Sequence, residues 1–186
     1  MKNSPSHAHQ PAPTAEQLHA RALALSDDPE QAVVLLAEAR RLDPSSGPIA
    51  LDRGARLLEL CRYAEAEAEL REASLLLPES PWPHYNLGWL YQELGDYENA
   101  AWEYEAALDL APHSPEILEN LLLVYTHLGT KPKRSIELID RALRADPDPD
   151  WQRWLRLQRA LLQGVTEAEN NLQDLNEGFP ENESGP

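Results

Sequence analysis

The residues capable of acid–base, nucleophilic or metal chemistry are scattered along this sequence and form no recognisable motif. Its six histidines include no HExxH pair, and its single cysteine, Cys61, belongs to no zinc-binding Cys–His cluster. The phosphate-binding motifs GxxxxGKS, GxxxxGKT and GxGxxG are absent, as is the GxSxG motif of serine hydrolases. Carboxylates are numerous because glutamate is numerous, and no pair of carboxylates forms a pattern that indicates acid–base catalysis. We therefore predict that the chain is not an enzyme and uses no metal or other cofactor.

The composition is that of an acidic globular protein. In 186 residues, 32 acidic side chains oppose 16 basic ones, which gives a formal net charge of −16. Such a surface repels nucleic acids and anionic membranes and attracts basic partners. A single cysteine excludes an intrachain disulfide, and no apolar run is long enough to span a bilayer. Because residues 1–13 lack the apolar core of a signal peptide, we expect a cytoplasmic protein with no nucleic-acid or membrane partner.

Prolines and small residues return at a nearly constant interval along the chain. The interval is 34 residues, and 35 at the last step, in the series Pro44, Pro78, Pro112, Pro147; Ala39, Ala73, Ala107, Ala142; and Ala32, Ala66, Ala100, Ser135. A further series, Ala20, Gly54 and Gly88, is broken by Leu122 in the last unit. Such a period is typical of stacked helical hairpins, which approach closely where the facing side chains are small. It defines four frames: 13–46, 47–80, 81–114 and 115–149.

Each frame is predicted to contain two helices joined by a short turn. In the third frame, Leu87 and Tyr91 lie on one helical stripe, which Gly95 ends, and Tyr104 lies on a second stripe that stops before Pro112. Helix starts are marked by a capping side chain that precedes a proline, in Asp28-Pro29, Ser80-Pro81 and Ser114-Pro115.

On these residues the chain resembles the tetratricopeptide repeat (TPR) family, whose pattern runs Leu-Gly, Tyr, Gly-Asp-Tyr, Ala, an aromatic, Ala and Pro. The third frame matches at Leu87, Gly88, Tyr91, Gly95, Asp96, Tyr97, Ala100, Tyr104, Ala107 and Pro112. The second frame has Arg53 and the first has His19 where the pattern has leucine, and Ala20 replaces the glycine of the first. The resemblance covers residues 13–149 and implies an all-α fold, a right-handed α-solenoid of helix-turn-helix repeats.

A solenoid needs a terminal element that covers its last face. We predict a single domain over residues 13–176, closed by a cap over residues 150–176 that is rich in tryptophan and leucine. The sequence leaves open whether this cap is one helix or a degenerate fifth hairpin that turns near Gly164. Residues 1–12 and 177–186 are predicted to be disordered tails.

The resemblance also implies a concave groove lined by the first helix of each hairpin, which binds a segment of another protein. Carried onto this chain, the predicted peptide-binding residues are Leu51, Leu58, Glu59, Trp82, Tyr85, Asn86, Trp89, Gln92, Glu93, Glu116, Glu119, Asn120, Leu123 and His127. This set is aromatic at its centre and acidic at its rim, so we predict a ligand with apolar anchors flanked by lysine or arginine. Trp102, on a second helix, is a candidate second contact.

The predicted ligand differs from the chaperone carboxylate that some members of the family bind. Leu51, Tyr85 and Glu119 stand where that carboxylate clamp has lysine or asparagine. The leading interpretation is therefore a scaffold or adaptor for another protein. Two alternatives stay open: a structural subunit that associates with itself into a homo-oligomer, and an accessory subunit that docks on a catalytic partner. Tyr85 and Trp89 have an alternative role to ligand binding, which is packing between hairpins. For Glu116 and Glu119 the alternative role is stabilisation of a helix N-terminus.

Overall fold

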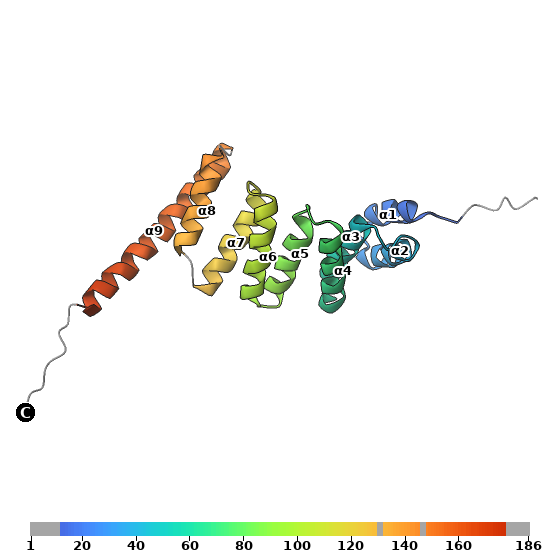
Figure 1. The fold of residues 1–186 in the computed structure, drawn as a ribbon, viewed down its shortest axis with the longest axis horizontal. Coiled ribbons are helices and arrows are strands. Elements are labelled where there is room, and N and C mark those ends of the chain that lie inside the picture. The colour runs from blue at the N-terminus through green and yellow to red at the C-terminus, as the bar shows by residue number, and fades with distance from the viewer. Residues whose placement is uncertain (1–11, 130–131, 146–147, 178–186) are drawn as a thin grey trace, which may run out of the picture. The chain divides into compact units, whose positions relative to one another are not determined.

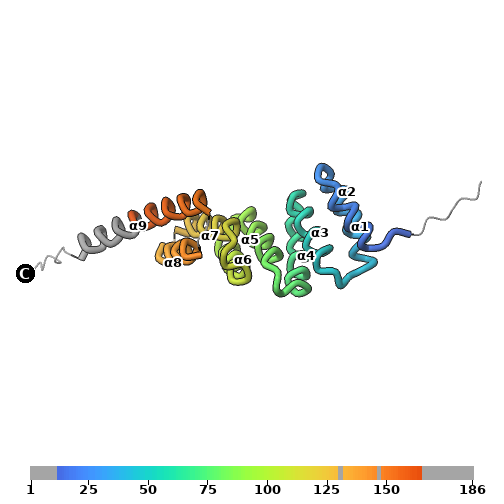
Figure 2. The backbone as a smooth tube through the Cα atoms, turned by 90° about the horizontal axis from the view of Figure 1, so that it is seen from above, coloured from blue at the N-terminus to red at the C-terminus, as the bar shows by residue number. Residues whose placement is uncertain are grey.

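The computed structural model describes residues 12–129, 132–145 and 148–177, with side chains as far as Gly164 (Figures 1 and 2). These residues form helices and no strand, as predicted. The helices are α1 (Ala15–Leu23), α2 (Pro29–Leu42), α3 (Gly47–Glu59), α4 (Tyr63–Leu76), α5 (Trp82–Glu93), α6 (Tyr97–Leu110), α7 (Pro115–Leu128), α8 (Pro132–Arg144) and α9 (Pro149–Glu177). The predicted disordered tails lie outside the described residues, apart from Ala12 and Glu177.

The chain divides into two compact units, Met1–Leu90 and Tyr91–Pro186, and the boundary falls within α5. In the first unit α1 packs on α2, α2 on α3 and α3 on α4. In the second unit α6 packs on α7, α7 on α8 and α8 on α9. Within each unit these helices therefore pack on their neighbours in sequence, which is the arrangement that the 34-residue period predicts.

The same turn closes three of the hairpins. Cys61, Gly95 and Gly129 lie 34 residues apart in sequence, and their φ angles of 56°, 74° and 59° are all in the left-handed region. Two of these positions hold glycine, which adopts this conformation without steric cost. Cys61 adopts it with a side chain, which is exposed in the turn between α3 and α4.

The α3–α4 hairpin shows why a small residue recurs at this interval. Gly54 is buried, and a Cβ atom added to it would lie 2.6 Å from Cγ of Leu70 and 2.7 Å from its Cδ2. Leu70, Leu57 and Ala66 are fully buried around this contact. The two helices can therefore pack at this distance only because Gly54 has no side chain.

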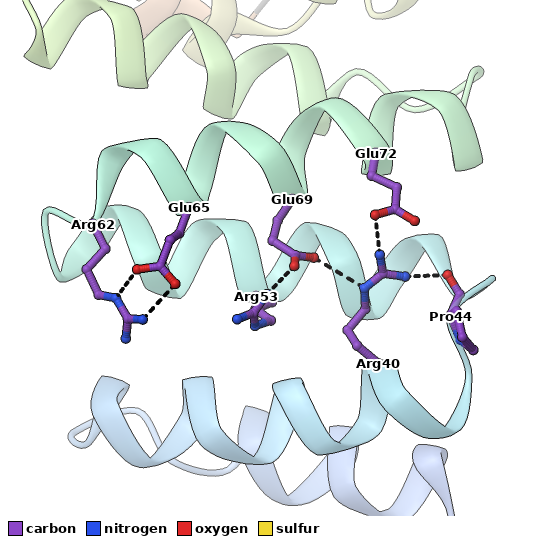
Figure 3. Close-up of polar contacts among 7 residues, drawn as sticks. All are labelled: Arg40, Pro44, Arg53, Arg62, Glu65, Glu69 and Glu72. Atoms are coloured by element: carbon purple, nitrogen blue, oxygen red, sulfur yellow. Dashed lines mark hydrogen bonds and ion pairs between the residues drawn. The ribbon is translucent and has the colours of Figure 1, made fainter.

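Arg53, which departs from the family pattern, is held by an ion pair inside the first unit. Its guanidinium pairs with Glu69 of α4, and Nε of Arg40 on α2 lies 3.2 Å from Oε2 of the same glutamate (Figure 3). Arg40 also reaches Glu72, with Nη2 2.5 Å from Oε2, and donates to the carbonyl oxygen of Pro44. Glu69 is only 14% exposed, so a largely buried carboxylate links three helices.

The first hairpin follows a different register from the others. Its helix α1 has only nine residues, and it buries Leu18 and Ala22, while Ala20 is exposed. The prediction that Ala20 takes the place of the tightly packed glycine is therefore wrong, because the short helix turns a different face to α2. His19, the second departure from the pattern, lies on α1 with Nε2 2.5 Å from Oδ2 of Asp52 on α3.

In the second unit, Tyr125 ties α7 to α6. Its side chain is buried, and its hydroxyl donates a hydrogen bond to Glu105. Burial and this carboxylate together hold the pKa of Tyr125 well above its usual value of 10. The predicted cap over residues 150–176 corresponds to α9, which is one continuous helix through Gly164 and has no hairpin turn there.

Candidate peptide-binding surfaces

The aromatic face of α5 belongs to the first unit. Trp82, Tyr85, Asn86 and Trp89 recur at helical spacing, and the rings of Trp82 and Tyr85 form an edge contact with centroids 5.8 Å apart. Trp82 is 44% exposed and Trp89 is 36% exposed, so both indoles reach solvent. Tyr85 and Asn86 are half-buried. This face therefore offers two large, partly exposed anchors that a ligand could cover.

The predicted residues of α3 contribute less to a binding surface. Leu58 is 4% exposed and belongs to the core, so the prediction that it lines the surface is wrong. The reason is that Leu57 and Leu58 both fall on the wide face of α3 that its neighbouring helices cover. Leu51 is half-buried, and the carboxylate of Glu59 pairs with Arg56 at 3.0 Å.

A groove of about 210 Å³ lies within the second unit, between α7 and α9. It is lined by Glu119, Leu122, Leu123, Thr126, Ser135, Trp154, Gln158 and Leu162. Small-molecule pockets usually enclose about 300 Å³ or more, so this volume suits a single side chain of a peptide better than a whole ligand. Glu119 is exposed at the groove, so its side chain is within reach of a ligand.

The walls of this groove are fixed by internal contacts. Trp154 stacks on Trp151 with ring centroids 4.7 Å apart and planes 15° apart, which holds the indole in place. The hydroxyl of Thr126 donates to the carbonyl oxygen of Leu122 at 2.9 Å, and Ser135 is buried. The surface of the groove is therefore partly polar and partly apolar, and Leu123, which is 46% exposed, contributes to the apolar part. The groove is suited to an apolar anchor beside a positive charge.

The other predicted residues of the second unit lie near neighbours in their own unit. Nδ2 of Asn120 donates to the carbonyl oxygen of Glu116 at 3.1 Å, and His127 stacks on Tyr97 with centroids 4.6 Å apart. Oε1 of Gln92 accepts a long hydrogen bond of 3.4 Å from Tyr104. Glu93 and Glu116 are exposed. Trp102 on α6 is 62% exposed, so its prediction as a second contact stands untested.

Sequence reasoning placed Glu119 and Leu123 at the groove and missed its opposite wall. Trp154, Gln158 and Leu162 are spaced by four residues and so occupy one stripe of α9. The sequence shows this spacing, but it predicts only a cap that covers the last face of the solenoid. The stripe faces α7 as well, so α9 supplies a wall to a groove in addition to closing the stack.

No group of three or more His, Cys, Asp or Glu side chains that could hold a metal ion occurs among the described residues. Within the same part of the chain, no helix is both long enough and apolar enough to cross a membrane.

Comparison with known proteins places this architecture among the all-α helical-repeat proteins. The TPR domain of Arabidopsis OM64 superposes with a TM-score of 0.59 at 24% identity, over 61% of this chain and 95% of that domain. MamA superposes with a TM-score of 0.64 at 21% identity, over 71% of this chain and 78% of that protein. The first TPR domain of Spaghetti (RPAP3), solved with the HSP90 peptide SRMEEVD bound, gives 0.61 at 20% identity, over 66% and 99% of the two chains.

Sequence comparisons identify the repeat itself. The model of the tetratricopeptide repeat family matches residues 85–150. The Photosystem I assembly protein Ycf3 of Rippkaea orientalis is 31% identical over 114 residues, and the match covers 51% of this chain and 65% of the length of that relative. Residues 85–150 therefore match the tetratricopeptide repeat, and the described residues share the helical-repeat fold of the neighbouring TPR domains. Proteins built from these repeats are scaffolds for interactions between proteins, and the repeats are typically not catalytic.

Proposed function

We propose that this chain is an adaptor that binds a peptide segment with an apolar or aromatic anchor flanked by lysine or arginine. The observation that carries the proposal is the α7–α9 groove, in which Trp154 and Leu123 present apolar surface beside the carboxylate of Glu119. The groove accepts one side chain, and a neighbouring basic residue of the ligand would neutralise Glu119.

The aromatic face of α5 supports the same chemistry in the first unit. Trp82 and Trp89 each lose few rotamers on binding, and such aromatic anchors commonly contribute about 2 kcal/mol or more when a ligand covers them. We propose that this face is a separate site, within the first unit, for an apolar peptide segment. Leu58 is removed from the predicted peptide-binding set because it is buried. The other predicted members stay proposed as additional ligand contacts, each within its own unit: Leu51, Glu59, Tyr85, Asn86, Gln92, Glu93, Glu116, Asn120 and His127.

The charge of the proposed ligand is opposite to that of the acidic peptide bound to the RPAP3 domain. The distinction depends on Leu51, Tyr85 and Glu119, because lysine or asparagine at those places would favour a carboxylate. With a net charge of −16, long-range attraction also favours a basic segment. Accordingly, we expect binding to weaken as salt is added, since exposed charges are screened beyond about 8 Å at physiological ionic strength.

The proposal can be tested with a matched pair of labelled peptides that share one leucine–tryptophan core and carry either lysine or glutamate on both flanks. Fluorescence anisotropy should show tighter binding of the lysine peptide. Trp154→Ala should weaken it by about 30-fold, the equivalent of about 2 kcal/mol. Glu119→Lys should reverse the preference between the two peptides. Leu75→Ala is the control, because it shortens an 81% exposed apolar side chain that lies outside the groove and outside the predicted contacts.

Two-dimensional NMR provides a second readout, since each of the five tryptophans gives one indole N–H signal. The signal of Trp154 should shift when the lysine peptide is added. Equal binding of both peptides, or unchanged affinity in Trp154→Ala, contradicts the proposed groove.

A further inference from the structure

A second pocket of the second unit lies where α8 ends and α9 begins. It has a volume of about 220 Å³, and its walls come from the α6–α7 turn, the start of α7, the end of α8 and the start of α9. The lining residues are His113, Pro115, Ala142, Ala145, Asp148 and Trp151. This pocket, which we call the Asp148 pocket, shares no lining residue with the α7–α9 groove. Like the groove, it is large enough for one side chain of a peptide.

The stacked tryptophans of α9 connect the Asp148 pocket with the α7–α9 groove. Trp151 lines the pocket and Trp154 lines the groove, and their ring centroids are 4.7 Å apart. Helix α7 contributes Pro115 to the pocket and Glu119, one turn later, to the groove. The pocket and the groove are therefore neighbours along both α7 and α9, so a single peptide can reach both.

The groups that line the Asp148 pocket favour a positive charge. Oδ1 of Asp148 accepts hydrogen bonds from the backbone N–H groups of Asp150 and Trp151, at 3.1 Å each. Because both bonds use Oδ1, the other carboxylate oxygen can accept from a ligand. Ala145 directly follows α8, whose last carbonyl groups carry the negative end of the helix dipole. Trp151 adds an indole ring, which attracts arginine and lysine side chains through the cation–π interaction.

An anion fits the same pocket less well. The start of α7 could attract one, but Pro115 has no N–H group to donate. The side chain of Ser114 already accepts from the N–H group of Ile117. Of the described side chains that line the pocket, only the imidazole of His113 can carry a positive charge. The net charge of −16 also disfavours an anionic ligand.

We propose that the Asp148 pocket binds a basic side chain of the same peptide whose apolar anchor occupies the α7–α9 groove. Arginine is favoured over lysine, because its planar guanidinium can lie on the indole of Trp151 and pair with the carboxylate of Asp148. This inference rests on the proposed function and adds one restriction to it. The ligand must place a basic residue at a set distance from its apolar anchor, whereas an acidic rim alone would accept many distances.

A series of labelled peptides tests this restriction on the full chain. Each peptide carries the leucine–tryptophan core and one arginine, joined by serine spacers of increasing length. Fluorescence anisotropy should show weak binding with the shortest spacers and the highest affinity at one intermediate length. The measurements are made at about pH 8, where histidine is ordinarily uncharged.

A double-mutant cycle on the best peptide tests the role of Asp148. Replacement of the arginine by citrulline, a neutral side chain of nearly the same shape, should weaken binding by about 10-fold. Asp148→Asn should weaken the arginine peptide by about the same factor and leave the citrulline peptide unchanged. Asparagine caps a helix as well as aspartate does, so α9 keeps its start. Asp150→Asn is the matched control, because it removes the same charge from an exposed residue of α9 that does not line the pocket.

Small probes test the Asp148 pocket without a peptide. In two-dimensional NMR, n-butylguanidinium should shift the indole N–H signal of Trp151, which is identified by its absence from Trp151→Phe. The neutral analogue n-butylurea should shift this signal much less. Asp148→Asn should remove the difference between the two probes, and Asp150→Asn should keep it.

Three results overturn the inference. These are an affinity that is independent of spacer length, an Asp148→Asn variant that weakens the arginine and citrulline peptides equally, and a Trp151 signal that responds alike to both probes. The proposed function fails in a different way. Peptide binding that depends on Trp154 but not on Asp148 supports the groove and rejects the pocket. Binding of n-butylguanidinium through Asp148, together with peptide affinity that Trp154→Ala leaves unchanged, supports a cation site and rejects the groove.

Discussion

Replacement of Gly54 by alanine tests whether close approach of α3 and α4 sets the repeat. The new Cβ would lie 2.6 Å from Cγ of Leu70, about 1 Å inside the optimal separation of two carbon atoms. Leu70 is fully buried and has little room to move, so we expect an overpacking cost of about 1–3 kcal/mol. Alanine also gains about 1 kcal/mol in helix propensity over glycine, which leaves a net loss of up to about 2 kcal/mol.

The most specific part of this prediction is that the effect of Gly54→Ala on the free energy of unfolding changes sign when Leu70 is replaced. In a Leu70→Ala background the obstructing atoms are gone, so Gly54→Ala should stabilise the protein by up to about 1 kcal/mol, the gain in helix propensity. The free energy of unfolding is measured by urea denaturation followed by circular dichroism. Gly164→Ala serves as a control, because a Cβ there meets no atom within 4 Å, and it should be stabilising. If Gly54→Ala stabilises both backgrounds, close approach is not the reason for glycine.

Three further substitutions test individual contacts. Cys61→Gly should raise the free energy of unfolding by up to about 1 kcal/mol in urea denaturation, because its φ of 56° is strained for a residue with a side chain, and Cys61→Ala should not. Glu69→Ala should lower the same quantity by about 1–3 kcal/mol because it leaves Arg40 and Arg53 without their shared carboxylate, whereas Arg53→Leu should cost less than about 1 kcal/mol. The raised pKa of Tyr125 stabilises the fold fully below pH 10 and less as the pH rises above it, so Tyr125→Phe should reduce the alkaline loss of stability seen in urea titrations at successive pH values.

The stacking of helices was predictable because it depends on residues that recur with one period. Gly54 indicates a close contact between two helices, and Gly95 indicates the end of a helix. In the structure, Gly54 lies at such a contact and Gly95 lies in a left-handed turn. Which residues of the first hairpin are buried was harder to predict. Helix α1 is short, so its register depends on which of its side chains the neighbouring helices cover. Ala22 is buried and Ala20 is exposed, although both are alanines on the same short helix.

The binding surfaces were predicted less well, for a different physical reason. A groove depends on which side chains remain uncovered, and that depends on neighbouring helices as well as on position in a repeat. Leu58 occupies a predicted surface position but is covered, whereas Trp154 lies beyond the last recognisable repeat and lines the α7–α9 groove. The 34-residue period of the sequence locates each hairpin, but it does not predict how many helices follow the last recognisable repeat.

Arg53 and His19, the two polar departures from the family pattern, show which contacts could have been sought in the sequence. A buried arginine or an enclosed histidine at a leucine position is stable only if a carboxylate lies within reach, since an unpaired charge in such a place is costly. Arg53 is matched by Glu69 on the other helix of its hairpin, and His19 by Asp52 on the first helix of the next hairpin. One partner therefore lies 16 residues onward and the other 33. Acids at these two separations were therefore candidates for both contacts in the sequence, because a hairpin and a repeat bring residues at about these separations together.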